Sequence, residues 1–315
     1  MRNYLTGKER LLVTALAFIL PKRRFNIGLW VLLCVPCLLA SCDHDVHSDE
    51  KESGLSVSLT WADEADQGTE VKDVKLWIFN ADNGSLVEEK HYGSAQEVAS
   101  QRFQLPEGTY RILTTTNLTE PFFISEQTRA LTNWNNILIG LTNPKNVRNN
   151  AYFGVTDVKI ANKEGSYVVQ NPMKSVLAEL TIIIENIPKG TEMSGKVLDC
   201  AGCLFPTQKN SDGDYGLPSI EPAEVELPTL LATESTLKSE VIRLMPTIQG
   251  SPASHIYLRL QLPDKTLQEF DITAPKMNVG GKYELRFKYE EMQPKMNLQT
   301  GINDWNDLNK EVTIK

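Results

Sequence analysis

The stretch KYELRFKY, residues Lys282–Tyr289, alternates strictly between polar and apolar side chains. Its apolar members fall on every second residue, which is the period of a β-strand with one face on a core and the other in water. The stretch LSVSLTW, residues Leu55–Trp61, has the same alternation near the other end of the chain. Both patterns are typical of antiparallel sandwiches, so the expected fold class is mostly β.

Further strands are expected between these two. Val74–Phe79 leads to the dipeptide Asn83-Gly84, a strong hairpin signal, and Leu86–Lys90 then returns as the second strand. Ile256–Leu262 alternates, and the stretch Val176–Ile184 is expected to be a long strand with Val176, Ala178, Leu180, Ile182 and Ile184 on one face.

The length of 315 residues predicts two domains, at about 150 residues each. The turn-like sequence Asn162–Gly165 lies near the middle, so we expect an N-terminal β-sandwich over 55–165 and a C-terminal β-sandwich over 166–315. One helix is expected over Ser125–Leu141, because Ser125 is a suitable N-cap and Leu131, Trp134 and Leu138 follow on one side.

The charge balance argues against a nucleic-acid partner. The formal net charge is -8, but residues 1–41 hold six of the 32 basic residues and one of the 40 acidic ones. The remaining chain has 26 basic and 39 acidic residues, a formal charge of -13. Non-specific binding to phosphates needs a basic face, so nucleic-acid binding is not expected.

Residues 1–41 have the pattern of an export signal. The apolar run Leu11–Leu20 has ten residues, fewer than the roughly 20 that a membrane-spanning helix needs. The basic triplet Lys22-Arg23-Arg24 is followed by the mostly apolar stretch Ile27–Ala40, as in the charged and apolar regions of a signal peptide.

The sequence Leu38-Leu39-Ala40-Ser41-Cys42 resembles the lipobox of bacterial lipoproteins, because two small residues precede a cysteine at the end of the apolar run. The resemblance implies that the signal is removed before Cys42 and that Cys42 carries fatty acids such as palmitate. Several acyl chains hold a protein stably on a membrane. A plain secretory signal with a chance cysteine is the alternative.

Residues 42–54 are expected to form a short flexible tether, since Val46 is their one apolar residue after Cys42. The acidic stretch directly after Cys42 resembles the surface-export signal of Bacteroidales lipoproteins. A simple spacer is an equally open interpretation.

Catalytic signatures are missing from the sequence: it has no G-x-S-x-G elbow, no Gly-Lys-Ser/Thr phosphate loop and no H-E-x-x-H pair. We therefore expect a protein that is not an enzyme, with no cofactor and no metal site.

The pair Cys200 and Cys203 is the one local arrangement with its own chemistry. Once the signal is removed and Cys42 is acylated, these are the two cysteines left in an oxidising compartment. A local structural disulfide is therefore predicted. A redox or zinc function is the alternative, although Leu204-Phe205-Pro206 does not favour the helix a redox motif needs, and zinc needs two more ligands.

A weak internal echo links the two halves. Leu105–Tyr110 and Val279–Tyr283 are each a glycine turn followed by a tyrosine and a strand. Two related sandwich domains or chance can explain it.

The order of these features resembles the fimbrial anchor lipoproteins of the Bacteroidales, relatives of the fimbrillins. The features are, in chain order, the lipobox, the acidic tether, the strand ending at Trp61, the stretch Val74–Phe79, the Leu105–Tyr110 turn with its strand ending at Asn117, the triplet Gly281-Lys282-Tyr283, and Ile302-Asn303-Asp304-Trp305 before a final strand.

The resemblance implies two antiparallel transthyretin-like β-sandwich domains. It also implies an outer-membrane lipoprotein that anchors a surface fimbrium or forms an accessory subunit of it, joined to fimbrial subunit proteins by β-strand addition. Residues 186–250 carry no family feature. The alternative is a surface lipoprotein that binds glycans on a platform of Trp61, Trp77, Trp134 and Trp305.

In this family the first strand is thought to be removed by cleavage at an arginine when a fimbrillin polymerises. Here residues 62–71 contain no arginine, and the first arginine after Cys42 is Arg102. We therefore expect the strand Leu55–Trp61 to stay in place, and the C-terminal strand ending at Lys315 to be an edge that a partner can use.

Overall fold

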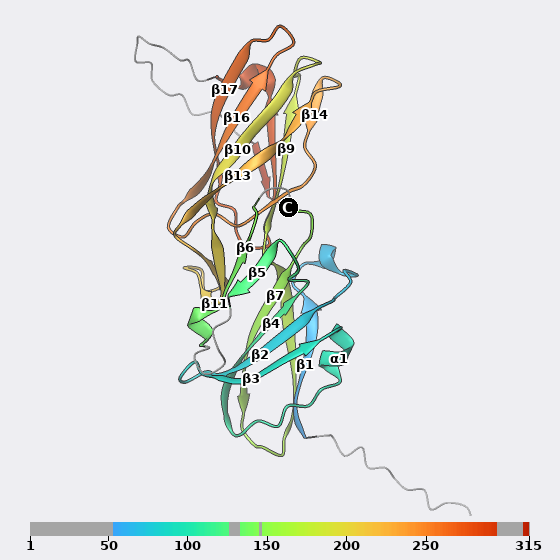
Figure 1. Ribbon diagram of the computed structural model, residues 1–315, viewed down its shortest axis with the longest axis vertical. Coiled ribbons are helices and arrows are strands. Elements are labelled where there is room, and N and C mark those ends of the chain that lie inside the picture. The colour runs from blue at the N-terminus through green and yellow to red at the C-terminus, as the bar shows by residue number, and fades with distance from the viewer. Residues whose placement is uncertain (1–52, 126–132, 145–146, 295–310, 315) are drawn as a thin grey trace, which may run out of the picture. The chain divides into compact units, whose positions relative to one another are not determined.

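Strands dominate the computed structural model, which describes residues 53–125, 133–144, 147–294 and 311–314 (Figure 1). The mostly β fold class is confirmed, with antiparallel pairing in several sheets. The predicted signal, most of the predicted tether, Cys42 and Trp305 lie outside the described residues.

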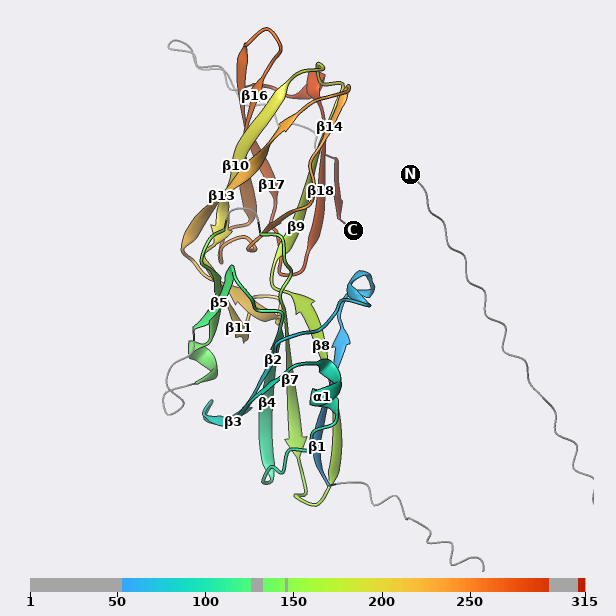
Figure 2. The same ribbon diagram turned by 45° about the vertical axis from the view of Figure 1, so that its right-hand side comes forward.

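The first sheet has six strands, in which β1 is an edge strand and pairs in parallel with β8 (Figure 2). All its other pairs are antiparallel. The short helix α1, Ala95–Ala99, packs against β1. In sheet order the strands are β1 (Gly54–Trp61), β8 (Ser166–Ser175), β7 (Tyr152–Ile160), β4 (Gly108–Thr116), β2 (Val74–Asn80) and β3 (Leu86–Tyr92).

A small second sheet and one face of the first sheet share a buried core. Trp77 and Leu113 of the first sheet share a buried cluster with Ile139 and Leu204 of the small sheet, all four with no exposed surface. The order of the small sheet is β12 (Tyr215–Pro218), β11 (Cys203–Lys209), β6 (Leu138–Leu141) and β5 (Phe122–Ser125).

Two more sheets enclose another buried cluster, to which Leu180, Val197, Leu258 and Leu285 belong. One sheet has the order β13 (Pro222–Leu231), β10 (Glu192–Ala201), β16 (Ala253–Gln261) and β17 (Leu267–Pro275). The other, here called the C-terminal sheet, has the order β14 (Thr236–Lys238), β9 (Ala178–Glu185), β18 (Lys282–Lys288) and β19 (Glu311–Ile314), while β15 (Ile242–Leu244) also pairs with β9.

The strands expected from the sequence are present as β1, β2, β3, β9, β16 and β18. The helix expected over Ser125–Leu141 is wrong wherever the structure describes that stretch: β5 ends at Ser125, a 3-10 turn (η3) spans Trp134–Asn136, and β6 follows. Pairing of β6 with both β5 and β11 buries Ile139 completely, so tertiary contacts override the weak helical spacing.

The sheets cross the predicted domain limits of 55–165 and 166–315. A cut after Gly165 passes between β7 and β8, which pair in one sheet, and β11–β12 of the second half joins the small sheet of the first. β9, the strand expected over Val176–Ile184, is the first strand of the C-terminal sheet in chain order. Division into two separately folding domains stays a prediction.

Both cysteines of the predicted disulfide lie at the crossing from β10 to β11, and the structure has them as free thiols. Cys200 is buried in the cluster of the third and fourth sheets, whereas its neighbour Ala201 and the following Leu204 pack in the other core. The consecutive residues Cys200 and Ala201 are thus buried in two different cores. Cys203 pairs with Gly140 of β6. Burial raises the pKa of the Cys203 thiol and raises that of Cys200 to about 12.

A glycine-x-tyrosine motif stands at the start of four described strands, β4, β8, β12 and β18, two more than the predicted echo. In β4, β8 and β18, the tyrosine hydroxyl bonds to the backbone of the preceding turn: Tyr110 Oη donates to Pro106 O at 2.9 Å, Ala161 N donates to Tyr167 Oη at 2.9 Å, and Asn278 N donates to Tyr283 Oη at 2.7 Å. The ring folds back over the glycine, since a Cβ on Gly281 would lie 2.6 Å from Tyr283 Oη. Close approach of the ring, rather than positive φ, therefore requires glycine at this position.

We predict that Gly281→Ala lowers the free energy of unfolding by about 1–3 kcal/mol, because the buried, hydrogen-bonded Tyr283 cannot move away from the added methyl. Gly202→Ala is the matched control, since its Cβ would meet nothing closer than 3.7 Å. Urea denaturation of both variants measures the difference. Equal stability of the two variants would contradict the role given to the motif.

We predict that, in the chain from Asp43 onward at pH 8, a thiol reagent modifies Cys203 in the folded protein and Cys200 only after unfolding. A pKa of about 12 leaves Cys200 as thiolate in about one molecule in ten thousand at this pH. Mass spectrometry counts the modified thiols, and Cys203→Ser is the control. Two unreactive cysteines in unfolded, unreduced protein would instead establish the disulfide predicted from the sequence.

Candidate functional site

The amino end of β1 is held on both sides of the strand. β1 pairs with β8 over its whole length, and Leu55 exchanges two backbone hydrogen bonds of 2.9 Å with Phe103 on the opposite side. Gly54 N donates to Gly165 O at 2.9 Å, and the Gln104 side chain donates to Ser53 O at 2.8 Å. Leu55 and Val57 are fully buried, so this end is part of the core.

The carboxyl end of β1 leads into an ion pair with the C-terminal sheet. Lys282 Nζ of β18 lies 2.6 Å from Asp63 Oδ2, two residues after Trp61. Asp63 also caps the short 3-10 turn η2, Glu64–Asp66, by accepting from Ala65 N at 2.9 Å. The Trp61 ring packs edge-on against Tyr152 at 4.8 Å between centroids. The segment after β1 is therefore attached to two different sheets.

The electrostatics of this pair favour its charged form. The hydrogen bond from Lys282 lowers the pKa of the Asp63 carboxyl, whereas burial raises the pKa of Asp66. Burial of Lys282 acts to lower its pKa, but the hydrogen bond to Asp63 and the charges of Asp66, Asp63 and Glu179 together raise it. Lys282 is thus a cation surrounded by three carboxylates.

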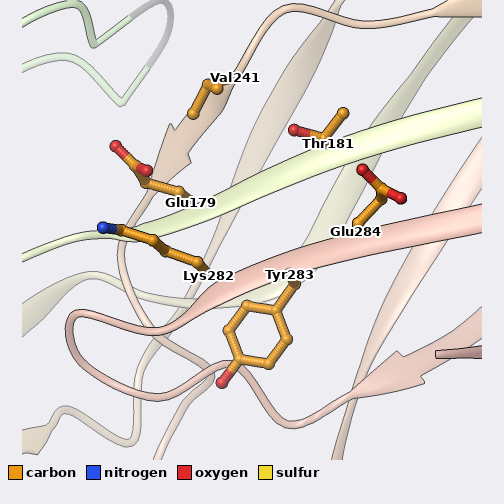
Figure 3. A pocket seen from close by; sticks show the side chains of 6 residues that line it. All are labelled: Glu179, Thr181, Val241, Lys282, Tyr283 and Glu284. Carbon is orange, nitrogen blue, oxygen red and sulfur yellow. The ribbon is translucent and has the colours of Figure 1, made fainter. Parts of the chain in front are cut away.

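A shallow pocket of about 80 Å³ lies beside Lys282, on the C-terminal sheet (Figure 3). Its charged groups already have partners, because Arg243 Nε lies 3.1 Å from Glu179 and Arg286 lies 3.0 Å from Glu284. Binding pockets for small molecules commonly measure about 300–1,000 Å³. Size and charge pairing therefore identify this hollow as part of the ion-pair network, not as a ligand site. Its lining residues are Glu179, Thr181, Val241, Lys282, Tyr283 and Glu284.

The last strand, β19, stands at the end of the strand order of the C-terminal sheet. It pairs antiparallel with β18, from Arg286 opposite Glu311 to Tyr283 opposite Ile314. The expected C-terminal strand is present and lies at a sheet edge; Lys315 lies outside the described residues.

None of the three described tryptophans is an open platform. Trp77 is completely buried, and Trp61 is half-buried against Tyr152. Trp134 is half-buried with the Arg111 guanidinium 3.8 Å from its ring centroid, and Arg111 in turn forms a 2.7 Å ion pair with Asp157. These rings serve packing and cation–π contacts.

Sequence patterns did not reveal the pairing of Asp63 with Lys282. Both residues lie in quoted stretches, but 219 positions separate them and no local spacing connects them. Cys42, the predicted lipidation site, lies outside the described residues. In the ranges that the structure describes, no helix is long and apolar enough to cross a membrane, and no three His, Cys, Asp or Glu side chains form a metal-binding group.

Comparison with solved structures shows the same fold in proteins of low sequence identity. The fimbrial anchor protein Mfa2 from Porphyromonas gingivalis is 15% identical with a TM-score of 0.51, covering 75% of this chain and 90% of that one. A candidate polysaccharide-binding protein from Bacteroides thetaiotaomicron is 10% identical with a TM-score of 0.53, covering 77% and 94%. A candidate adhesin from the same organism is 11% identical with a TM-score of 0.51, covering 78% and 94%.

No curated protein matches the sequence. The family model for fimbrillin-A associated anchor proteins Mfa1 and Mfa2 matches residues 44–309. Because this match spans most of the chain, the protein belongs to the family of fimbrillin-A associated anchor proteins Mfa1 and Mfa2.

Proposed function

We propose that this protein is a non-enzymatic outer-membrane lipoprotein, attached through lipid on Cys42, that anchors a surface fimbrium or forms an accessory subunit of it. The observation that carries the proposal is the family match, which begins at residue 44, two residues after the predicted lipidation site. The fimbrial anchor Mfa2 from Porphyromonas gingivalis, which shares the fold, supports the same role.

The proposal assigns β1 to the attachment side of the molecule. β1 follows the predicted tether and is fixed by β8, by Phe103 and by the Asp63–Lys282 ion pair. Removal of β1 would release Cys42 together with it, because Cys42 precedes β1 in the chain. The proposed anchor therefore retains β1 in its functional form.

The proposal assigns the edge formed by β18 and β19 to the partner side. An edge strand presents unpaired backbone groups, and a fimbrial subunit can add a strand there by main-chain hydrogen bonding. β19 has four residues and pairs with one neighbouring strand, β18. A partner strand that replaces β19 beside β18 therefore has few backbone hydrogen bonds to displace. The proposal therefore places the contact with a fimbrial subunit at this edge.

Non-enzymatic function is supported by the surroundings of the histidines. His91 and His255 each pair with an aspartate, Asp73 and Asp199, but their side chains are 62% and 54% exposed and lie outside the pocket. Glycan binding draws less support than anchoring, because the described tryptophans are buried or covered.

We predict that Cys42→Ala abolishes fatty-acid incorporation and releases the protein from the membrane, since the acyl chains supply the attachment. Metabolic labelling with palmitate and membrane fractionation measure both effects. Cys203→Ser is the matched control and is expected to behave as the wild type. Retained labelling and membrane association of the Cys42→Ala protein would refute the proposed lipid anchor.

We predict that protein from fimbriate cells retains β1, and that deletion of the six residues from Lys310 to Lys315 weakens fimbrial attachment by removing β19. N-terminal analysis of the mature protein tests the first part, and fimbriae shed into the medium test the second. A mature chain that begins after Trp61 would overturn the assignment of β1. Unchanged attachment of the truncated protein would overturn the assignment of β19.

A further inference from the structure

The pairing of β1 with β8 has a direction that matters under tension. The two strands run parallel through eight residue pairs, from Gly54 opposite Ser166 to Trp61 opposite Met173. Gly54 is the end at which the chain arrives from the tether. At the other end of the ladder, β8 finishes at Ser175 and continues through two residues into β9 of the C-terminal sheet. The two connections therefore leave the β1–β8 ladder at opposite ends.

Tension between the tether and the C-terminal sheet pulls the amino end of β1 and the carboxyl end of β8 apart. In a parallel pair these two ends are at opposite ends of the ladder, so the strands must slide past each other and all their backbone bonds carry load together. In an antiparallel pair the same two ends would be neighbours, and the bonds would open one after another. The parallel arrangement thus loads the ladder in shear.

Side-chain contacts oppose the same sliding motion. A slip of one residue turns every β1 side chain to the opposite face, and a slip of two withdraws Leu55 and Val57 from sites where they are fully buried. On the other side of β1, the backbone pair between Leu55 and Phe103 must break as well. At the far end, Asp63 must leave Lys282, 2.6 Å away, before β1 can move toward the tether.

We propose that β1 is a force-bearing strand, a shear clamp that transmits tension from the tether to the C-terminal sheet through β8 and the Asp63–Lys282 ion pair. Its biological use rests on the proposed function, in which Cys42 is fixed to the membrane and a fimbrium pulls on the C-terminal sheet. The clamp itself is a property of the folded chain and is measured without membrane or partner.

The test is single-molecule pulling on the chain from Asp43 onward in two geometries. One handle is always placed at Glu234, an exposed loop position before β14. The other is placed either at the amino terminus, which loads β1 in shear, or at the exposed position of Gln67, which peels β1 from its carboxyl end. Both handles use inserted azido residues or terminal tags, so Cys200 and Cys203 stay unchanged.

We expect a high peak force in the shear geometry and only a fraction of that force in the peeling geometry. The reason is that the unfolding force depends on the energy barrier along the direction of pulling. Lys282→Ala is expected to lower the shear peak. Lys288→Ala is its matched control, since Lys288 pairs with Glu291 and not with the segment after β1. Equal peak forces in the two geometries, or a shear peak that Lys282→Ala leaves unchanged, would overturn the clamp.

The two proposals can fail separately. If the pulling assay shows the shear peak but the Cys42→Ala variant stays on the membrane, the clamp is supported and the proposed lipid anchor is refuted. If the Cys42→Ala variant leaves the membrane but the peak forces in the two pulling geometries are equal, the lipid anchor is supported and the clamp is refuted.

Discussion

The parallel pairing of β1 with β8 is the contact on which the first sheet depends. Parallel neighbours cannot be joined by a tight turn, so the chain must leave β1, build β2, β3, β4 and β7, and return. That return brings residues 166–175 between β1 and β7. It also explains why the sheets cross the midpoint of the chain. β8 completes the first sheet and β9, two residues later, begins the C-terminal sheet.

A buried polar residue supports the position of β8. Asn171 has no exposed surface, and its Nδ2 donates to Thr114 Oγ1 at 2.9 Å and to Gly154 O at 3.2 Å. Its Oδ1 accepts from Thr156 Oγ1 at 2.9 Å. Since a buried amide without partners is costly, a shift of β8 along β7 would leave these groups unpaired. Asn171 also stands opposite Leu59 of β1, so the network that holds β8 indirectly fixes the register of β1.

Local patterns predicted the elements and the β2–β3 hairpin, but not the pairing of strands that lie far apart in the sequence. The alternation in Leu55–Trp61 and Lys282–Tyr289 identified β1 and β18, because a strand with one buried face carries an apolar side chain at every second residue. β8 lacks this signal: Val168 is 72% exposed whereas Asn171 is buried, the reverse of what polarity suggests. The Asp63–Lys282 pair joins residues 219 positions apart, and only the folded topology brings them together.

The remaining sheet edges differ in how readily another strand can pair with them. β3 is an edge of the first sheet and carries Glu88, Glu89 and Lys90 in succession. β13 is an edge of the third sheet and contains Pro222 and Pro228, which have no N–H to donate. Charges and prolines are the features by which natural edge strands avoid association. The edge strand β19 of the C-terminal sheet contains no proline, and Glu311 is its one charged residue, so it carries fewer of these features than β3 or β13. The strand β1 and the edge strand β19 thus belong to two sheets that the Asp63–Lys282 ion pair connects.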